Sequence, residues 1–103
     1  CVRVPVKTSH SESANIEFEN EYDLETVKKI LRNAPGCKVV DENKDGGYIS
    51  PLEAEGDYLT FISRVRKDHS NKKALNMWIV SDNLLKGAAL NTVQIAECLI
   101  KKK

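Results

Sequence analysis

The sequence predicts an α+β domain in which two main helices pack on a mainly antiparallel sheet. Several segments alternate apolar and polar residues, as strands do, and two others carry apolar residues at helical spacing. Hairpin-length connections between the later strands favour antiparallel pairing. The predicted order is β-β-α-β-β-β-α, and 103 residues are enough for one hydrophobic core.

The first two predicted strands lie on either side of a polar corner. In residues 1–7, Val2, Val4 and Val6 share one face, which is typical of a half-buried strand. The hydroxyl-rich stretch 8–13 interrupts this pattern and is expected to form the corner. Alternation resumes over residues 15–19, which are predicted to form the second strand.

The first helix has a clear beginning and a clear end. Asp23 is a suitable N-cap, because its carboxylate can accept hydrogen bonds from the first free backbone N–H groups. The apolar residues that follow recur at helical spacing, and residues 33–36, with Pro35 and Gly36, stop the helix. The apolar residues are Leu24, Val27, Ile30 and Leu31.

The middle of the chain alternates between short strands and loops. Residues 37–40 are predicted to form a short strand, and the polar, glycine-containing stretch 41–57 is predicted to be mostly loop. Two further strands, over 59–66 and 74–80, flank the charged turn 67–73.

The final helix is predicted to begin after a cap at Ser81 or Asp82. Its apolar residues between Leu85 and Ile100 lie on one side. The lysines at 101–103 suit a solvated helix C-terminus, where positive charge is favourable.

Composition and charge exclude several classes of protein. The formal net charge is +1 and the signs are interspersed, so we expect no nucleic-acid partner. No apolar run is long enough for a membrane span, and no targeting or lipidation motif occurs, so the expected location is cytoplasmic. The chain begins with Cys1 rather than methionine, which indicates a processed start or a piece of a longer protein.

Neither the cysteines nor the acidic loop predicts a metal site. Cys1, Cys37 and Cys98 are odd in number and contain no CxxC element, which argues against a disulfide framework or a zinc knuckle. Residues 41–46 resemble the opening of a calcium loop, but Leu52 stands where a bidentate glutamate is required. Cys1 could also be an N-terminal nucleophile with its own amine as base, but 103 residues are few for such hydrolases, and this alternative is disfavoured.

Three polar residues are candidates for a functional site. His10 lies between serines and could act as a general acid or base, although it could equally be a surface histidine. Arg3 could bind a carboxylate through two hydrogen bonds or simply face water. Asn83 could cap the last helix or contact a ligand there, whereas His69 is expected to be a solvated turn residue.

Several segments together resemble the C-terminal part of aspartate-semialdehyde dehydrogenase. The likeness spans the whole chain with order and spacing kept. It is carried by residues 1–6 (CVRVPV), 10–12 (HSE), 32–36 (RNAPG), 76–84 (NMWIVSDNL) and 86–91 (KGAALN).

The resemblance implies an NADP-dependent oxidoreductase. Enzymes of this family reduce L-aspartyl 4-phosphate to L-aspartate 4-semialdehyde with NADPH and release phosphate, early in lysine (diaminopimelate), methionine and threonine synthesis. His10 matches the histidine that moves the proton, and Arg3 matches the arginine that holds the substrate carboxylate. Asn83 falls near the nicotinamide cofactor, and Ser9 stands where the family often has glycine.

The resemblance also implies that essential parts lie upstream. No GxGxxG occurs, and none of the three cysteines lies in the family's nucleophile motif. Residues 1–103 are therefore expected to be an inactive fragment of the catalytic and dimerisation domain, whose first strand is cut from a larger sheet. The expected assembly is a homodimer. The last helix, about residues 83–101, packs either on its own domain or on the absent nucleotide-binding domain. The alternative is a self-contained small α+β binding or interaction module.

Overall fold

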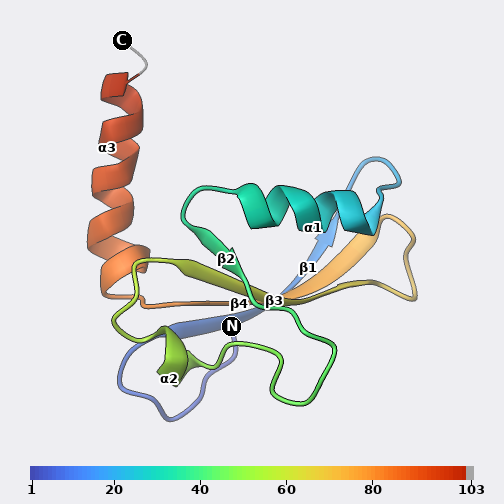
Figure 1. Ribbon diagram of the computed structural model, residues 1–103, viewed down its shortest axis with the longest axis horizontal. Helices are drawn as coiled ribbons and strands as arrows, with labels where there is room; N and C mark the ends of the chain where they lie inside the picture. The colour runs from blue at the N-terminus through green and yellow to red at the C-terminus, as the bar shows by residue number, and fades with distance from the viewer. Residues whose placement is uncertain (102–103) are drawn as a thin grey trace.

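A computed structural model of the chain describes residues 1–101, and it contains one four-stranded sheet (Figure 1). The strands are β1 (His10–Glu17), β2 (Cys37–Val39), β3 (Thr60–Lys67) and β4 (Ala74–Ser81), in the order β1-β4-β3-β2. β4 pairs antiparallel with β1 and β3, while β2 pairs parallel with β3. The predicted α+β class with a mainly antiparallel sheet is confirmed.

The helix α1 (Leu24–Asn33) covers one face of the sheet (Figure 1). Its apolar side is packed against a buried cluster from β3 and β4, which removes that side from water. Asp23 caps it as predicted, since its Oδ2 accepts hydrogen bonds from the Thr26 amide at 2.8 Å and hydroxyl at 2.7 Å. The buried cluster consists of Ile62, Val65, Leu75 and Met77.

The other face is covered by the long loop between β2 and β3. This loop contains a short helix, α2 (Pro51–Ala54), within the range predicted as mostly loop. Ala54 is fully buried against Phe61 and Val80, and the indole Nε1 of Trp78 donates to the Ile49 carbonyl at 2.8 Å. The sheet is therefore covered on both faces over its central part.

A bulge in β3 shapes this second face. The register with β4 shifts between Ser63 and Arg66, and Arg64 has a φ of 56°, in the left-handed region. Asp41 holds the bulge, because its Oδ1 accepts from the Arg64 amide at 2.8 Å and its Oδ2 lies 3.4 Å from Lys28 Nζ.

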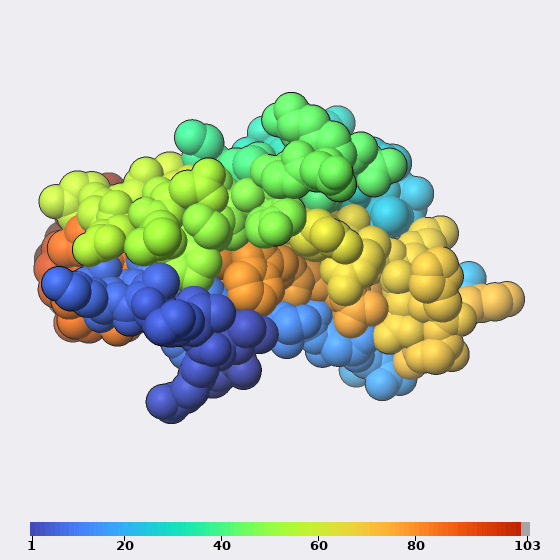
Figure 2. Space-filling model, turned by 90° about the horizontal axis from the view of Figure 1, so that it is seen from below, coloured from blue at the N-terminus to red at the C-terminus, as the bar shows by residue number. Residues whose placement is uncertain are grey.

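The predicted first strand is wrong. Residues 1–7 make only one isolated bridge, between Val2 and Ser11, and Pro5 has no N–H with which to continue a ladder. Seen from below, the N-terminal segment forms a separate ridge that projects from the molecule beside β1 (Figure 2).

The predicted polar corner at 8–13 is also partly wrong, because β1 already begins at His10. Two features explain why polar residues form a strand there. Backbone pairing with β4 extends to His10, and α1 covers the sheet only farther along, so no apolar side chains are needed.

The N-cap of the last helix is Leu84 rather than Ser81 or Asp82, and Asp82 holds the turn that leads into the helix. Asp82 Oδ1 accepts hydrogen bonds from the amides of Leu84 at 2.9 Å and Leu85 at 3.0 Å. The first turns are a π-helix, η1 (Leu85–Leu90), which continues as α3 (Asn91–Lys101). The predicted end at Lys102 and Lys103 lies outside the described residues.

Helix α3 stands away from the sheet (Figure 1). None of its residues is buried, and its large apolar side chains are more than half exposed. Within residues 1–101, no helix is long and apolar enough to cross a membrane. The exposed apolar side chains of α3 are Val93, Ile95, Leu99 and Ile100.

Candidate active site

The isolated bridge at the N-terminus brings two of the predicted site residues together. The Val2 amide donates to the Ser11 carbonyl at 2.8 Å, and the pairing is antiparallel. Continuing this register by one residue in each direction places Arg3 opposite His10 and Cys1 opposite Glu12. Because alternate residues of a strand share a face, all four side chains belong to one face of this edge.

His10 occupies the first position of β1, opposite Ser81 of β4. Its side chain is 45% exposed, and its Nε2 lies 3.2 Å from Glu12 Oε1. Ala14, farther along the same face, packs into the cluster under α1. His10 and Glu12 thus project from the same side of the sheet as α1, at the part that α1 leaves uncovered.

Arg3 and Asn83 are both exposed. Asn83 lies two residues beyond Ser81, the partner of His10, so the three predicted residues gather at one end of the sheet. Within residues 1–101, neither the Arg3 guanidinium nor the Asn83 amide forms a side-chain hydrogen bond, so both groups can bind a ligand without losing an internal partner.

Asp82 fixes the backbone on which Asn83 lies. It is 4% exposed, and its Oδ2 accepts from the Gly56 amide at 2.8 Å in addition to the two amides at the start of η1. The hydrogen bonds from Gly56, Leu85 and Leu84 hold the pKa of Asp82 below its usual value, because they favour the charged carboxylate. Sequence reasoning singled out Asp82 only as a possible cap and missed the link to Gly56, which is 26 residues away.

The corner before His10 has an uncommon backbone. Ser9 has a φ of 75°, a conformation that glycine adopts without strain and other residues rarely do. This explains why glycine is suited to the position before the histidine. The Thr8, Ser9 and Ser11 hydroxyl oxygens are buried without a hydrogen-bond partner within the described chain.

The sequence analysis considered Cys1 only as an N-terminal nucleophile and did not predict that it lies beside His10 and Glu12. One ligand atom each from Cys1, His10 and Glu12 lie within 4.8 Å of one another, and all three residues are exposed. The sequence could have indicated that residues 10 and 12 share a face, because alternate residues of a strand do. It could not indicate that the N-terminal segment pairs with that strand.

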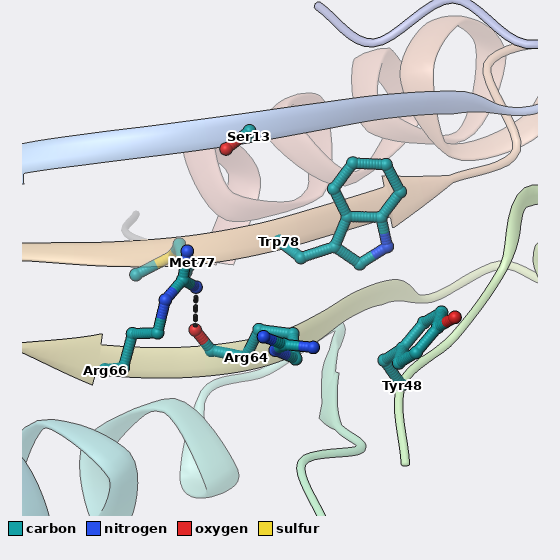
Figure 3. Close-up of a pocket in the computed structure, with 6 residues that line it drawn as sticks. All are labelled: Ser13, Tyr48, Arg64, Arg66, Met77 and Trp78. Atoms are coloured by element: carbon teal, nitrogen blue, oxygen red, sulfur yellow. Dashed lines mark hydrogen bonds between the residues drawn. The ribbon is translucent and has the colours of Figure 1, made fainter. Parts of the chain in front are cut away.

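A separate hollow of about 280 Å³ contains none of the three predicted site residues (Figure 3). Arg66 Nη1 donates to the Arg64 carbonyl there at 2.7 Å, beside the bulge. The hollow is lined by Ser13, Tyr48, Arg64, Arg66, Met77 and Trp78.

Comparison with known proteins shows the family to which the chain belongs. A family model described as "Semialdehyde dehydrogenase, dimerisation domain" matches residues 1–86. The chain belongs to this family. The resemblance found in the sequence is thereby confirmed at the level of the family.

Individual relatives support the same family assignment. The chain is 52% identical over 100 residues to the aspartate-semialdehyde dehydrogenase of Rickettsia bellii, covering 97% of this chain and 30% of that protein. It is 47% identical over 102 residues to the enzyme of Aquifex aeolicus, covering 99% of this chain and 30% of that protein.

A solved structure of this family has a similar fold. A crystal structure of aspartate semialdehyde dehydrogenase II complexed with ASA from Vibrio cholerae matches with a TM-score of 0.84 and 35% identity, covering 96% of this chain and 29% of that chain. This semialdehyde dehydrogenase dimerisation domain therefore spans about 30% of the length of the curated relatives it matches.

Proposed function

We propose that this chain is the C-terminal part of an NADP-dependent aspartate-semialdehyde dehydrogenase that works in the cytoplasm as a homodimer. The reaction is the reduction of L-aspartyl 4-phosphate to L-aspartate 4-semialdehyde with release of phosphate. The observation that carries the proposal is the bridge between Val2 and Ser11, which brings the exposed residues Arg3 and His10 to the same edge of the sheet. A cation and a proton-transfer group at the same edge suit a substrate that has both a carboxylate and a reacting carbonyl.

His10 is proposed to move the proton. An imidazole can accept and donate a proton at its ring nitrogens, and the exposure of His10 allows it to meet a nucleophile from outside this chain. The Glu12 carboxylate, 3.2 Å from Nε2, can hold the ring in one orientation. A thiol nucleophile needs such a partner, because the thiolate is the reactive form.

Arg3 is proposed to hold the substrate carboxylate. A planar guanidinium can donate two parallel hydrogen bonds to a carboxylate, which fixes both the position and the angle of the substrate. The bridge at Val2 anchors the backbone on which Arg3 lies, so the substrate is held at a defined place relative to His10.

NADPH supplies the hydride in this family, but the described residues do not fit a whole dinucleotide. Residues 1–101 contain no glycine-rich turn between a strand and a helix, which is the usual pyrophosphate site. Asn83 offers one exposed polar side chain for a contact near the nicotinamide. We assign the dinucleotide site and the nucleophilic cysteine to the upstream part of the protein, so the chain alone is inactive.

The self-contained interaction module is disfavoured by family membership and by α3. A complete module would bury the apolar side chains of its last helix, yet no residue of α3 is buried. We propose that α3 packs on the upstream nucleotide-binding domain.

The experiment that tests this function is steady-state kinetics of the full-length protein that contains this chain. His10→Asn is expected to lower kcat by about 100-fold or more, since lost acid–base catalysis typically has that cost. His69→Asn, at an exposed turn residue, is the matched control and should retain full turnover. Equal activity of the two variants would contradict the assigned role of His10.

A further inference from the structure

We infer that Cys1, His10 and Glu12 form a binding site for a borderline-soft divalent cation such as Zn²⁺, and that this cation blocks the proton-transfer histidine. One ligand atom from each residue lies within 4.8 Å of the other two. Thiolate, imidazole and carboxylate are the three kinds of ligand that Zn²⁺ takes from proteins.

The distances suit a tetrahedral ion after small side-chain adjustments. Donors at roughly 2.0–2.3 Å from Zn²⁺ lie about 3.3–3.6 Å apart in a tetrahedron. His10 Nε2 and Glu12 Oε1 are already 3.2 Å apart. The Cys1 thiol is exposed, so a rotation about its side-chain bond can bring it closer without disturbing packed neighbours.

The backbone holds the three ligands in place independently of any ion. His10 and Glu12 are alternate residues of β1 and therefore project from the same face. Cys1 is held opposite Glu12 by the adjacent bridge, in which the Val2 amide donates to the Ser11 carbonyl at 2.8 Å. Prior organisation of this kind lowers the entropy lost when an ion binds.

Charge also favours a dication. A thiolate and a carboxylate together carry two negative charges, which match Zn²⁺, and the neutral imidazole adds a third ligand. Arg3, on the same face, opposes the ion, but it is exposed and can turn its charge toward water. Three protein ligands leave the fourth position open to water.

The consequence for the enzyme is inhibition, and this step rests on the proposed function. A metal ion bound to Nε2 of His10 occupies the lone pair that would accept the proton. Turnover should therefore fall with rising Zn²⁺ and recover when a chelator removes the ion.

The test is a titration of the full-length protein with Co²⁺, which reports thiolate ligation by its charge-transfer absorption, followed by competition with Zn²⁺. Full-length protein is needed because the free amino group at Cys1 of the short chain would itself chelate metal. We expect one Co²⁺ per chain with a thiolate band. Cys1→Ser should abolish the band, and the matched variant Cys98→Ser, at a cysteine outside the cluster, should retain it.

A second ligand is tested in the same way. Glu12→Gln should weaken Zn²⁺ binding by at least about 10- to 100-fold. Loss of a residue that only hydrogen-bonds to a metal ligand typically lowers metal affinity by that factor, and Glu12 is proposed as a ligand itself. Glu19→Gln, at an exposed glutamate outside the cluster, should bind normally. Circular dichroism of each variant confirms folding. Absence of a thiolate band, or a band that survives in Cys1→Ser, would overturn the site.

Inhibition is measured as the ratio of turnover with and without Zn²⁺ for each protein. Wild type should be inhibited and recover with chelator, while Cys1→Ser should resist at the same Zn²⁺ concentration. Equal inhibition of both would contradict the inference. Failure of metal binding would leave the dehydrogenase assay unaffected, and failure of that assay would leave the Co²⁺ spectrum unaffected, so the two failures are distinguishable.

Discussion

Arg3 and His10 are seven residues apart in sequence, and each is adjacent to a residue of the bridge between Val2 and Ser11. Their residue types were enough to nominate both as site residues. Their common face depends on the single bridge between Val2 and Ser11, which no periodicity in the sequence predicts. Sequence reasoning therefore identified the chemical groups at this edge, whereas the addition of Cys1 and Glu12 required the three-dimensional register.

Replacement of Arg3 tests its proposed role. In the full-length protein, Arg3→Lys should raise KM for aspartyl phosphate by about tenfold or more while kcat changes less, because lysine keeps the charge but loses the two-point contact. Steady-state kinetics measure this split. Arg32→Lys, at an exposed arginine of α1, should leave both constants unchanged. A fall in kcat at unchanged KM would contradict substrate binding by Arg3.

Asp68 should make the hairpin between β3 and β4 sensitive to acid. The Ser70 hydroxyl and amide and the Asn15 amide donate to its carboxylate, and they lower its pKa to about 2. Because the pKa in the folded protein lies below the ordinary aspartate value of 3.8, this carboxylate stabilises the fold at higher pH, and the stabilisation is lost as pH falls from about 4 to 2.

Unfolding curves at a series of pH values measure this effect. Asp68→Asn should reduce the loss of stability between about pH 4 and 2, whereas Asp45→Asn, at an exposed loop residue, should leave it unchanged. An Asp68→Asn protein with an unaltered acid profile would show that these hydrogen bonds do not contribute.

At the scale of elements, sequence patterns predicted the segments that pack on one another. The helix over 24–33 and the strands near 60–67 and 74–81 were found within one or two residues, because burial of one face imposes a period on each. Prediction failed where that constraint is absent. Residues 1–7 have the valine alternation of a strand but lack a continuous partner, and residues 10–13 form a strand without apolar side chains.

The last helix, α3, has no buried residue. Its apolar residues predicted a buried face, and the sequence left open what that face packs on. In the structure α3 is exposed along its length and begins with the π-helical turns of η1. A helix in a folded protein is usually stabilised by packing of its apolar face against other elements rather than by the helix propensity of its residues.

Hydrogen exchange tests the proposed docking of α3. Amides of α3 should exchange faster in the isolated chain than in the full-length protein, because the upstream domain would bury this helix. Amides of β4, which pairs on both sides, provide the internal control and should be protected in both proteins. Equal protection of α3 in the two proteins would contradict docking on the upstream domain.

At the scale of the whole molecule, the polar groups for which we propose a catalytic role lie at one end of the sheet of this dimerisation domain. Arg3, His10 and Asn83 lie at that end, exposed and without a nucleophile assigned among the cysteines present. The exposed apolar side of α3 is a second feature that favours the proposal that the chain is one part of a larger enzyme. Its match to about 30% of the length of its relatives agrees with this division.

The most direct test of this account is NADPH oxidation with L-aspartyl 4-phosphate, measured side by side for the full-length protein and the 103-residue chain. The account predicts turnover by the full-length protein and none above background by the chain alone. Turnover by the chain alone, or none by a folded full-length protein, would contradict the claim that this domain supplies only the substrate-binding and proton-transfer groups of the enzyme.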